Sequence, residues 1–193
     1  MTERVDAARN RARVLDAAAR LFAEAGVDEV SMEDVARAAG VGKATLYRRY
    51  ADKGELSAAL IDADARSLQA EVLSGLPSAG PYATPRQRLE RLLDLLAGFV
   101  DRHSPLIAVA RRRRDGLTTP GYQWMRQALR AWLRQCEVAG DLAPDSDIEY
   151  LADALLAPLS PDLWLHQRVE LGMSHERLAA GLLTLVPWRE RDV

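Results

Sequence analysis

The sequence predicts an all-α protein of about nine helices, in which a three-helix N-terminal domain with a helix-turn-helix precedes a larger helical domain. Apolar residues recur at helical spacing along most of the 193 residues. No stretch alternates with a period of two for long enough to propose a sheet. A segment rich in glycine, proline and serine, residues 74–85, is typical of a connector and separates two groups of helices.

The first group contains four helices whose ends carry residues with known boundary preferences. Glycines are expected to end the first two helices, because a glycine adopts the left-handed conformation of a helix C-cap without strain. Side-chain oxygens that accept backbone N–H bonds are expected to begin the second and the fourth. The first helix ends at Gly26. The second runs from Ser31 to Gly40, and Ser31 forms a capping box with Asp34. The third covers Lys43–Tyr50, with Leu46 and Tyr50 as a buried pair, and the fourth follows Asp52.

The second group follows the connector and is predicted in the same way. Caps, capping boxes and a proline at the first helical position mark the starts, and later prolines mark the breaks. The first helix starts at Thr84, Pro85 and Gln87, a second short one starts at Ser104-Pro105, and DGLTTPG (residues 115–121) is a loop. A stripe from Tyr122 to Cys136 predicts the third helix. The fourth starts at Ser146 with Glu149 and should be kinked or broken by Pro158 and Pro161, and Ser174 caps the last.

Composition narrows the class of protein. Hydrophobic residues make up 48% and charged residues 28% of the chain, as in an ordinary globular protein. No apolar run reaches the roughly 18 residues that a membrane span needs, so no membrane partner is expected. The first residues carry scattered charges and no apolar core of a signal peptide. The single cysteine, Cys136, excludes an internal disulfide framework, and a cytoplasmic protein is expected.

Two late helices are apolar around more than one face. One carries Leu151 and Leu155, and the other carries Leu178 and Leu182, each beside further alanine, leucine or valine positions. A helix of this kind is either central in the core or in contact with a partner. We prefer the second interpretation and predict a homodimer whose contact includes these four leucines.

Positive charge gathers in VSMEDVARAAGVGKATLYRRYADKGEL, residues 30–56. The whole chain has a net charge of −2, yet residues 40–53 hold four cations and one acid, including both lysines of the protein, Lys43 and Lys53. Two short helices joined by a glycine-containing turn predict a helix-turn-helix, whose second helix enters the major groove of DNA. Short side chains at its start would allow close approach, and donors along it would bind phosphates. The short residues are Gly42, Ala44 and Thr45, and the donors are Tyr47, Arg48, Tyr50 and Lys53. A solvated amphipathic helix pair is the plain alternative.

Residues 11–56 also resemble the DNA-binding domain of TetR/AcrR-type transcriptional regulators. The matching pieces are LFAEAG at the end of the first helix, DVARAAGV in the second, and ATLYRRY followed by DK, all without a gap. The resemblance implies that residues 1–53 bind a palindromic DNA operator and that residues 54–193 dimerise and bind a small-molecule effector, as in a repressor released by that effector. By position, Lys43, Ala44, Thr45, Tyr47 and Arg48 fall where the family contacts DNA, and Ser31 and Lys53 fall where it touches phosphates. Gly54 departs from the bulkier or charged residue that is usual there.

An enzyme without DNA binding and a helical protein-interaction module are the rival classes. GVGKAT lacks the first glycine and the final Ser or Thr of a phosphate loop, and there is no G-x-S-x-G. The histidines show no metal-ligand spacing, so no metal, no cofactor and no catalytic residue is predicted. Cys136 lies on a core stripe and is expected to pack as a small hydrophobe, with a redox sensor as the alternative. Arg111–Arg114 is either a solvated helix end or an anion site.

The effector site is predicted only from residue type. Aromatic and imidazole side chains of the second domain are the candidates, because they can line a largely apolar pocket with a few polar groups. Trp132 lies on a core stripe, whereas Trp124 lies on the opposite side of the same helix, where it meets another helix or faces a cavity. The full set is His103, Tyr122, Trp124, Trp132, Trp164 and His166.

Overall fold

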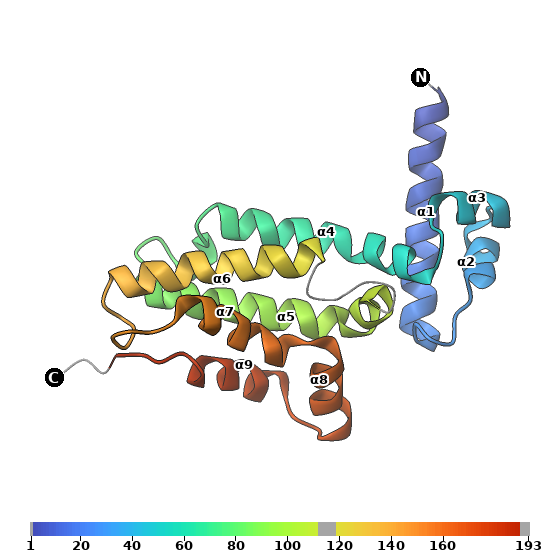
Figure 1. The fold of residues 1–193 in the computed structure, drawn as a ribbon. Coiled ribbons are helices and arrows are strands. Elements are labelled where there is room, and N and C mark those ends of the chain that lie inside the picture. The colour runs from blue at the N-terminus through green and yellow to red at the C-terminus, as the bar shows by residue number, and fades with distance from the viewer. Residues whose placement is uncertain (1, 112–118, 190–193) are drawn as a thin grey trace. The chain divides into compact units, whose positions relative to one another are not determined.

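The computed structural model describes residues 2–111 and 119–189, and within those ranges the chain is helical (Figure 1). The described elements are α1 (Thr2–Ala25), α2 (Met32–Ala39), α3 (Lys43–Arg49), α4 (Lys53–Leu73), the 3-10 turn η1 (Pro77–Ala79), α5 (Pro85–Arg111), α6 (Pro120–Val138), α7 (Ile148–Leu156), the 3-10 turn η3 (Ala157–Leu159), α8 (Pro161–Leu165), the π-helical turn η4 (His166–Glu170) and α9 (His175–Thr184). The all-α prediction is confirmed: the described ranges hold no strand, and one isolated antiparallel bridge joins Leu142 and Trp188.

The chain forms two compact units. The N-terminal unit comprises Met1–Ala63 and Pro105–Arg113, and the C-terminal unit comprises Asp64–Ser104 and Arg114–Val193. Both boundaries fall inside long helices, α4 and α5, so the compact N-terminal unit extends past residue 53 and includes the end of α5. The assignment of DNA binding to residues 1–53 and of effector binding to residues 54–193 stays a prediction.

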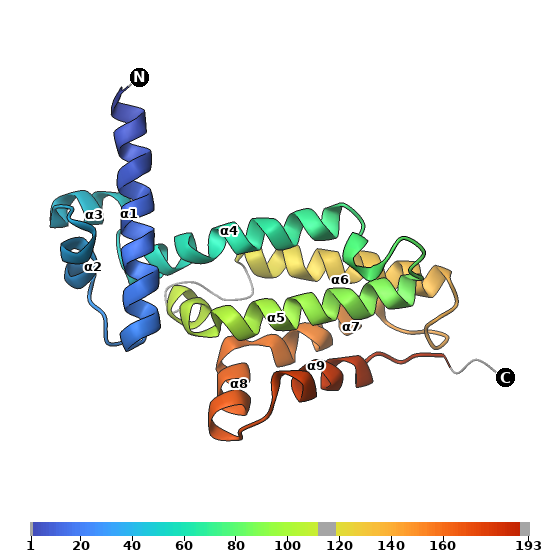
Figure 2. The same cartoon turned by 180° about the vertical axis from the view of Figure 1, so that it is seen from behind.

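The N-terminal unit is built on a small apolar core. Helix α1 packs against α2, and α2 packs against α3. Helices α2 and α3 lie together on one side of α1 (Figures 1 and 2). The core takes side chains from all of the unit's helices, including Val109 from the end of α5. Its members are Val14, Ala17, Ala18, Phe22, Val27, Val30, Met32, Val35, Ala36, Ala39, Leu46, Tyr50, Leu56 and Val109.

The helices of the C-terminal unit are held together by polar contacts as well as by an apolar interior. In α4, Asp64 lies 3.0 Å from Nε2 of His103 in α5, and in α8 the indole of Trp164 donates to Asp101 of α5 at 2.9 Å. Residues 141–143 pair with the chain that follows α9, since Ala143 N–H donates to Pro187 O at 2.8 Å. Figure 1 shows α7 running beside α6, and the two helices are in contact.

Several helix boundaries follow the predicted chemistry. Asp52 accepts from Glu55 N–H at 2.9 Å and caps α4, and Thr84 and Gln87 form the reciprocal bonds of a capping box before α5. Ser174 accepts from Arg177 N–H at 3.2 Å and begins α9. The break that prolines were expected to cause is also present, because α7 ends at Leu156 and α8 begins at Pro161.

Three boundaries differ from the prediction. Helix α5 continues through Pro105 to Arg111, so no separate helix starts at Ser104-Pro105; the Ser104 hydroxyl donates to the carbonyl of Val100 inside the same helix. Asp147, not Ser146, caps α7 by accepting from Tyr150 N–H, while Ser146 donates to Ala143 O. Helix α3 ends at Arg49 with Tyr50 as its C-cap. The side chains of Arg111–Arg114 and residues 115–118 of the predicted loop lie outside the described residues.

Candidate nucleic-acid interface

The turn between α2 and α3 is fixed by local backbone chemistry. Ser31 accepts from Asp34 N–H at 3.1 Å, and the Asp34 carboxylate accepts from Ser31 N–H at 3.1 Å, so a capping box starts α2. Gly40 has φ +62°, in the left-handed region, and its N–H donates to the carbonyl of Arg37 at 3.1 Å. A Cβ at Gly40 would also lie 2.6 Å from Nη2 of Arg13. The backbone conformation therefore favours glycine at this turn, whereas the Arg13 side chain could move aside.

Helix α3 is anchored by one residue and exposed along the rest of its surface. Leu46 is buried in the N-terminal core, and it fixes which face of α3 points outward. The outward face carries five of the eight residues that the sequence assigned to DNA contact, namely Lys43, Ala44, Thr45, Tyr47 and Arg48, together with Arg49. Short residues at the start and donors along the helix thus share one accessible surface, as major-groove binding requires.

Tyr50 does not belong to that surface. Its side chain is only 6% exposed and packs in the same core as Leu46, and its hydroxyl has no hydrogen-bond partner in the described structure. A phosphate contact from Tyr50 would require the ring to leave the core. The structure therefore gives this residue a packing position, which the i, i+4 relation to Leu46 had also indicated.

Lys53 is half-buried and already engaged. Its ammonium donates to the backbone carbonyls of Val27 at 2.7 Å and Asp28 at 3.0 Å, both in the segment between α1 and α2. An ammonium has three donors, so one remains for a phosphate. Lys53 ties the start of α4 to the loop that leads into the helix-turn-helix, a contact that sequence spacing did not indicate. Ser31 is exposed, but its hydroxyl is occupied by the capping box.

One charged residue that lies beside the predicted DNA-contact residues was not predicted from the sequence. Glu33, in the first turn of α2, lies 3.3 Å from Nζ of Lys43 and accepts from the Tyr47 hydroxyl at 3.4 Å. The pKa of this carboxyl is lowered, chiefly by a hydrogen bond from its own backbone N–H and next by the contacts with Lys43. The group is therefore ionised at neutral pH. Glu33 and Lys43 are ten residues apart and lie on either side of a turn, so helical spacing could not predict their contact.

Comparison with known proteins identifies the family of this domain. Residues 14–60 match the family model described as "Bacterial regulatory proteins, tetR family". An HTH-type transcriptional regulator of Staphylococcus aureus (strain USA300) is 43% identical over 61 residues, which is 32% of this chain and 33% of the relative. The N-terminal domain is therefore similar to the DNA-binding domain of TetR-family regulators. Because the matched segment spans only about a third of the curated relatives, those comparisons concern the N-terminal part of the chain.

Solved structures extend the likeness to the whole fold. A TetR-like transcriptional regulator from Rhodococcus sp. RHA1 is 25% identical, covers 91% of this chain and 92% of its own, and has a TM-score of 0.57. A regulator from Saccharomonospora viridis, solved in complex with choline, has a TM-score of 0.70 at 19% identity and covers 93% of this chain and 98% of its own. At that identity the second likeness concerns the fold alone.

The six candidate effector residues lie in different surroundings, and their assignment to an effector site stays a prediction. Trp132 and Trp164 are buried in the C-terminal unit, Trp124 is half-buried, and His166 is exposed beside Glu170 at 2.9 Å. His103 contacts Asp64, and its ring lies tilted against that of Phe99 with the centroids 4.9 Å apart. Tyr122 donates to Asp153 at 3.2 Å. An open hollow of about 390 Å³ is lined instead by Pro85, Arg134, Gln135, Val138 and Ala139.

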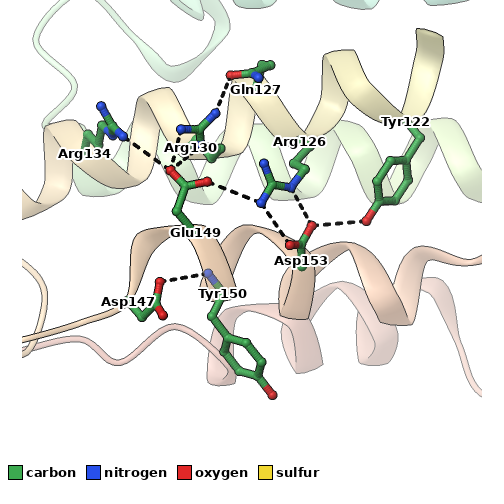
Figure 3. A network of polar contacts seen from close by, with 9 residues as sticks. All are labelled: Tyr122, Arg126, Gln127, Arg130, Arg134, Asp147, Glu149, Tyr150 and Asp153. Carbon is green, nitrogen blue, oxygen red and sulfur yellow. Dashed lines mark hydrogen bonds and ion pairs between the residues drawn. The ribbon is translucent and has the colours of Figure 1, made fainter. Parts of the chain in front are cut away.

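A network of ion pairs fastens α7 to α6 (Figure 3). Arg126 binds Asp153 with two bonds, at 2.7 and 3.0 Å, and Arg130 donates to Glu149 at 2.7 Å. The arginine hydrogen bonds lower the pKa of Asp153, against an opposing effect of burial. Sequence spacing held a signal for this network, since the arginines are four residues apart and so are the two carboxylates. Tyr122, assigned to the effector site, is part of it.

A second polar cluster surrounds Asp101 of α5. Its Oδ1 accepts from the Trp164 indole at 2.9 Å and from Nε of Arg168 at 2.7 Å, and its Oδ2 lies 3.9 Å from Nδ1 of His175. Burial works to raise the pKa of Asp101, but the hydrogen bonds from Trp164 and Arg168 outweigh it and hold the pKa below its ordinary value. This cluster explains the buried position of Trp164, whose N–H would otherwise lack an acceptor.

The leucines assigned to a dimer contact lie mainly inside the chain. Leu155, Leu178 and Leu182 are buried in the C-terminal unit, and Leu151 is half-buried. Leu155, Leu178 and Leu182 fill the interior, so a second copy could not reach them without opening it, whereas Leu151 is partly accessible. Large apolar residues that are exposed on the same region are Tyr150, Leu163, Val169, Leu171 and Leu185.

Cys136 is fully buried in α6. Burial, with the nearby carboxylates of Asp141 and Glu90, raises the pKa of the thiol to about 12. A neutral, inaccessible thiol is a packing residue, because the thiolate is the reactive form.

No described helix is both long and apolar enough to span a bilayer, and the described residues hold no cluster of His, Cys, Asp and Glu fit to bind a metal ion.

Proposed function

We propose that this chain is a TetR-family, DNA-binding transcriptional regulator of the cytoplasm and not an enzyme. In the proposed mechanism a homodimeric repressor binds a palindromic operator and is released by a small-molecule effector. The observation that carries the proposal is the outward face of α3, where Lys43, Ala44 and Thr45 come first and Tyr47 and Arg48 follow. Leu46 and the Gly40 turn hold that face outward.

Residues at the start of α3 are proposed to read bases. Lys43 can donate to guanine O6 or N7, and the methyl group of Thr45 can contact a thymine methyl. Tyr47, Arg48 and the third donor of Lys53 are proposed to bind phosphates, which fixes the register without reading sequence. Phosphate attraction acts locally, so a protein with a net charge of −2 can bind DNA through this surface.

The experiment that tests DNA binding compares two duplexes. The wild-type protein is used to select a binding sequence from a random pool, starting with DNA upstream of its own gene, and affinity is then measured for the selected duplex and a scrambled version. Lys43→Ala should weaken binding to the selected duplex by roughly 1–3 kcal/mol and the scrambled one by less. Arg20→Ala, an exposed cation of α1 outside the helix-turn-helix, serves as the charge-matched control. A wild-type protein that retains no duplex from the pool contradicts the proposed function.

The dimer is proposed to form through the C-terminal unit, using exposed apolar residues in place of the four predicted leucines. Tyr150 is 71% exposed and Val169 is 75% exposed. The proposal requires that these residues belong to one contiguous apolar patch, because such patches, and not single exposed side chains, mark surfaces that meet a partner. Two recognition helices about 34–36 Å apart would then meet successive major grooves. Val169→Glu should yield monomers by sedimentation and weaken operator binding. Val138→Glu changes a residue at the end of α6 that is even more exposed, at 88%, and should leave the dimer intact.

The effector is proposed to be a small, largely apolar molecule that binds the C-terminal unit and lowers DNA affinity. A ligand shifts a conformational equilibrium only by its differential affinity for the two states. Metabolites can be screened by thermal shift, because a ligand at 100 times its dissociation constant stabilises by about 2.7 kcal/mol. The mechanism is contradicted if every compound that stabilises the protein leaves its affinity for the selected duplex unchanged.

A further inference from the structure

The helix-turn-helix places a carboxylate beside the start of its recognition helix. Oε1 of Glu33 lies 3.3 Å from Nζ of Lys43 and 3.4 Å from the hydroxyl of Tyr47, which donates to it. Lys43 and Tyr47 are four residues apart and therefore project from the same face of α3. A single carboxylate from α2 thus holds two side chains of the surface proposed to meet DNA.

Both members of the ion pair are accessible to solvent. The side chain of Lys43 is 67% exposed and that of Glu33 is 37% exposed. Exposed pairs of this kind contribute little to folding stability, so DNA can rearrange the contact without unfolding the domain. The contact is therefore positioned to influence binding more than stability.

We propose that Glu33 is a specificity-determining residue of the recognition surface, an inference that rests on the DNA-binding function proposed above. Glu33 acts by weakening the attraction of Lys43 for phosphates more than its attraction for base edges. At a guanine edge, Lys43 can donate to O6 or N7 and still keep Glu33, because an ammonium has three donors and the base carries no net charge. At a phosphate, Lys43 would bring two anions together, and their repulsion opposes the contact.

The physical consequence is a lower affinity for random DNA. Non-specific binding depends almost entirely on phosphate contacts, whereas binding to the selected site also uses base edges. Removing the charge of Glu33 should free Lys43 to bind a phosphate on any sequence. Specificity, as the ratio of the two affinities, should therefore fall although overall affinity rises.

The test uses Glu33→Gln, which keeps the size of the side chain and removes its charge. Affinity and its salt dependence are measured on the selected duplex and on the scrambled duplex. Glu29→Gln is the matched control, since Glu29 is an exposed acid just before α2 that pairs with no cation in the described structure. Glu33→Gln should bind the scrambled duplex about two- to five-fold more tightly for each subunit, with a smaller gain on the selected duplex. Its salt slope on the scrambled duplex should steepen by about one for each subunit.

A second background shows whether Glu33 acts through Lys43. In Lys43→Ala protein, adding Glu33→Gln should no longer steepen the salt slope, because the lysine that would take the phosphate is absent. A purely structural role of Glu33 would change thermal unfolding and would not change the salt slope. The proposal is overturned if Glu33→Gln and Glu29→Gln give the same salt slopes and the same ratio of affinities. That result leaves the proposed function standing, whereas a wild-type protein that binds no duplex removes both.

Discussion

Replacing Lys53 should destabilise the N-terminal unit even in the absence of DNA. Its ammonium donates to two backbone carbonyls, those of Val27 and Asp28, at 2.7 and 3.0 Å. Lys53→Met keeps most of the apolar stem and removes both bonds. Hydrogen bonds to a charged donor contribute about 1.5–3 kcal/mol each when buried, and less where water competes. Since one bond is only partly buried and the other is exposed, we expect a total loss of about 2 kcal/mol.

The assay is thermal unfolding, followed by circular dichroism at a fixed pH and salt concentration. For a chain of this length, a loss of about 2 kcal/mol lowers the midpoint by about 4 to 8 °C. Lys43→Met is the control, because Lys43 is the other lysine of the protein and makes an exposed ion pair. Its substitution should change stability by less than about 1 kcal/mol. At a temperature where both variants are folded, Lys53→Met should weaken the selected and scrambled duplexes by equal factors.

Equal midpoints for Lys53→Met, Lys43→Met and the wild type would refute this reasoning. Such a result would mean that the ammonium of Lys53 does not hold the segment between α1 and α2 in solution. A loss of DNA affinity without any loss of stability would then assign the side chain wholly to phosphate binding.

Three further outcomes follow from the described contacts. Cys136 is buried and the pKa of its thiol is about 12, so native protein should react with a disulfide reagent far more slowly than protein unfolded in urea; rapid labelling of the native chain would favour a redox role. Tyr50→Phe removes a buried hydroxyl that has no hydrogen-bond partner among the described residues, so chemical denaturation should show unchanged or higher stability, by up to about 1 kcal/mol; a clear loss would reveal a bonded hydroxyl. The pKa of Asp101 is lowered in the folded state, so its stabilisation is complete above its ordinary pKa of 3.8 and is lost as pH falls through the lower folded value. Asp101→Asn should therefore flatten the acid limb of the stability profile, and an unchanged limb would contradict the cluster around Asp101.

Local chemistry explains why much of the fold could be predicted. The caps at Asp52, Thr84 and Ser174 and the turn at Gly40 depend on residues within a few positions of one another, so the sequence contains all the information that they need. The exception at Pro105 has a tertiary cause. A proline forbids the preceding hydrogen bond but does not end a helix when the surrounding helix is held by packing, and both Leu96 and Val100 before it are buried.

By itself the sequence predicted which residues of α3 meet DNA, because Leu46 and Tyr50 form an i, i+4 apolar pair and the remaining side chains are short or polar. The structure shows that Leu46 is buried and that Lys43, Thr45 and Tyr47 are exposed. The sequence also predicted most of the helices in their order through their apolar stripes and caps, although no separate helix starts at Ser104-Pro105 and α8 was not predicted. Only the tertiary structure decided which charged groups lie side by side across a turn or between helices. Glu33 with Lys43, Lys53 with the carbonyl of Val27, and Asp101 with Trp164 are separated by 10, 26 and 63 residues. The tertiary structure also decided the position of the apolar late helices, since a wide apolar arc is compatible with either the core or a contact with a partner. In the structure, Leu155, Leu178 and Leu182 are buried in the core. Periodicity reports the direction of a side chain from its own helix, whereas a contact also depends on where the second helix has been placed by the rest of the fold.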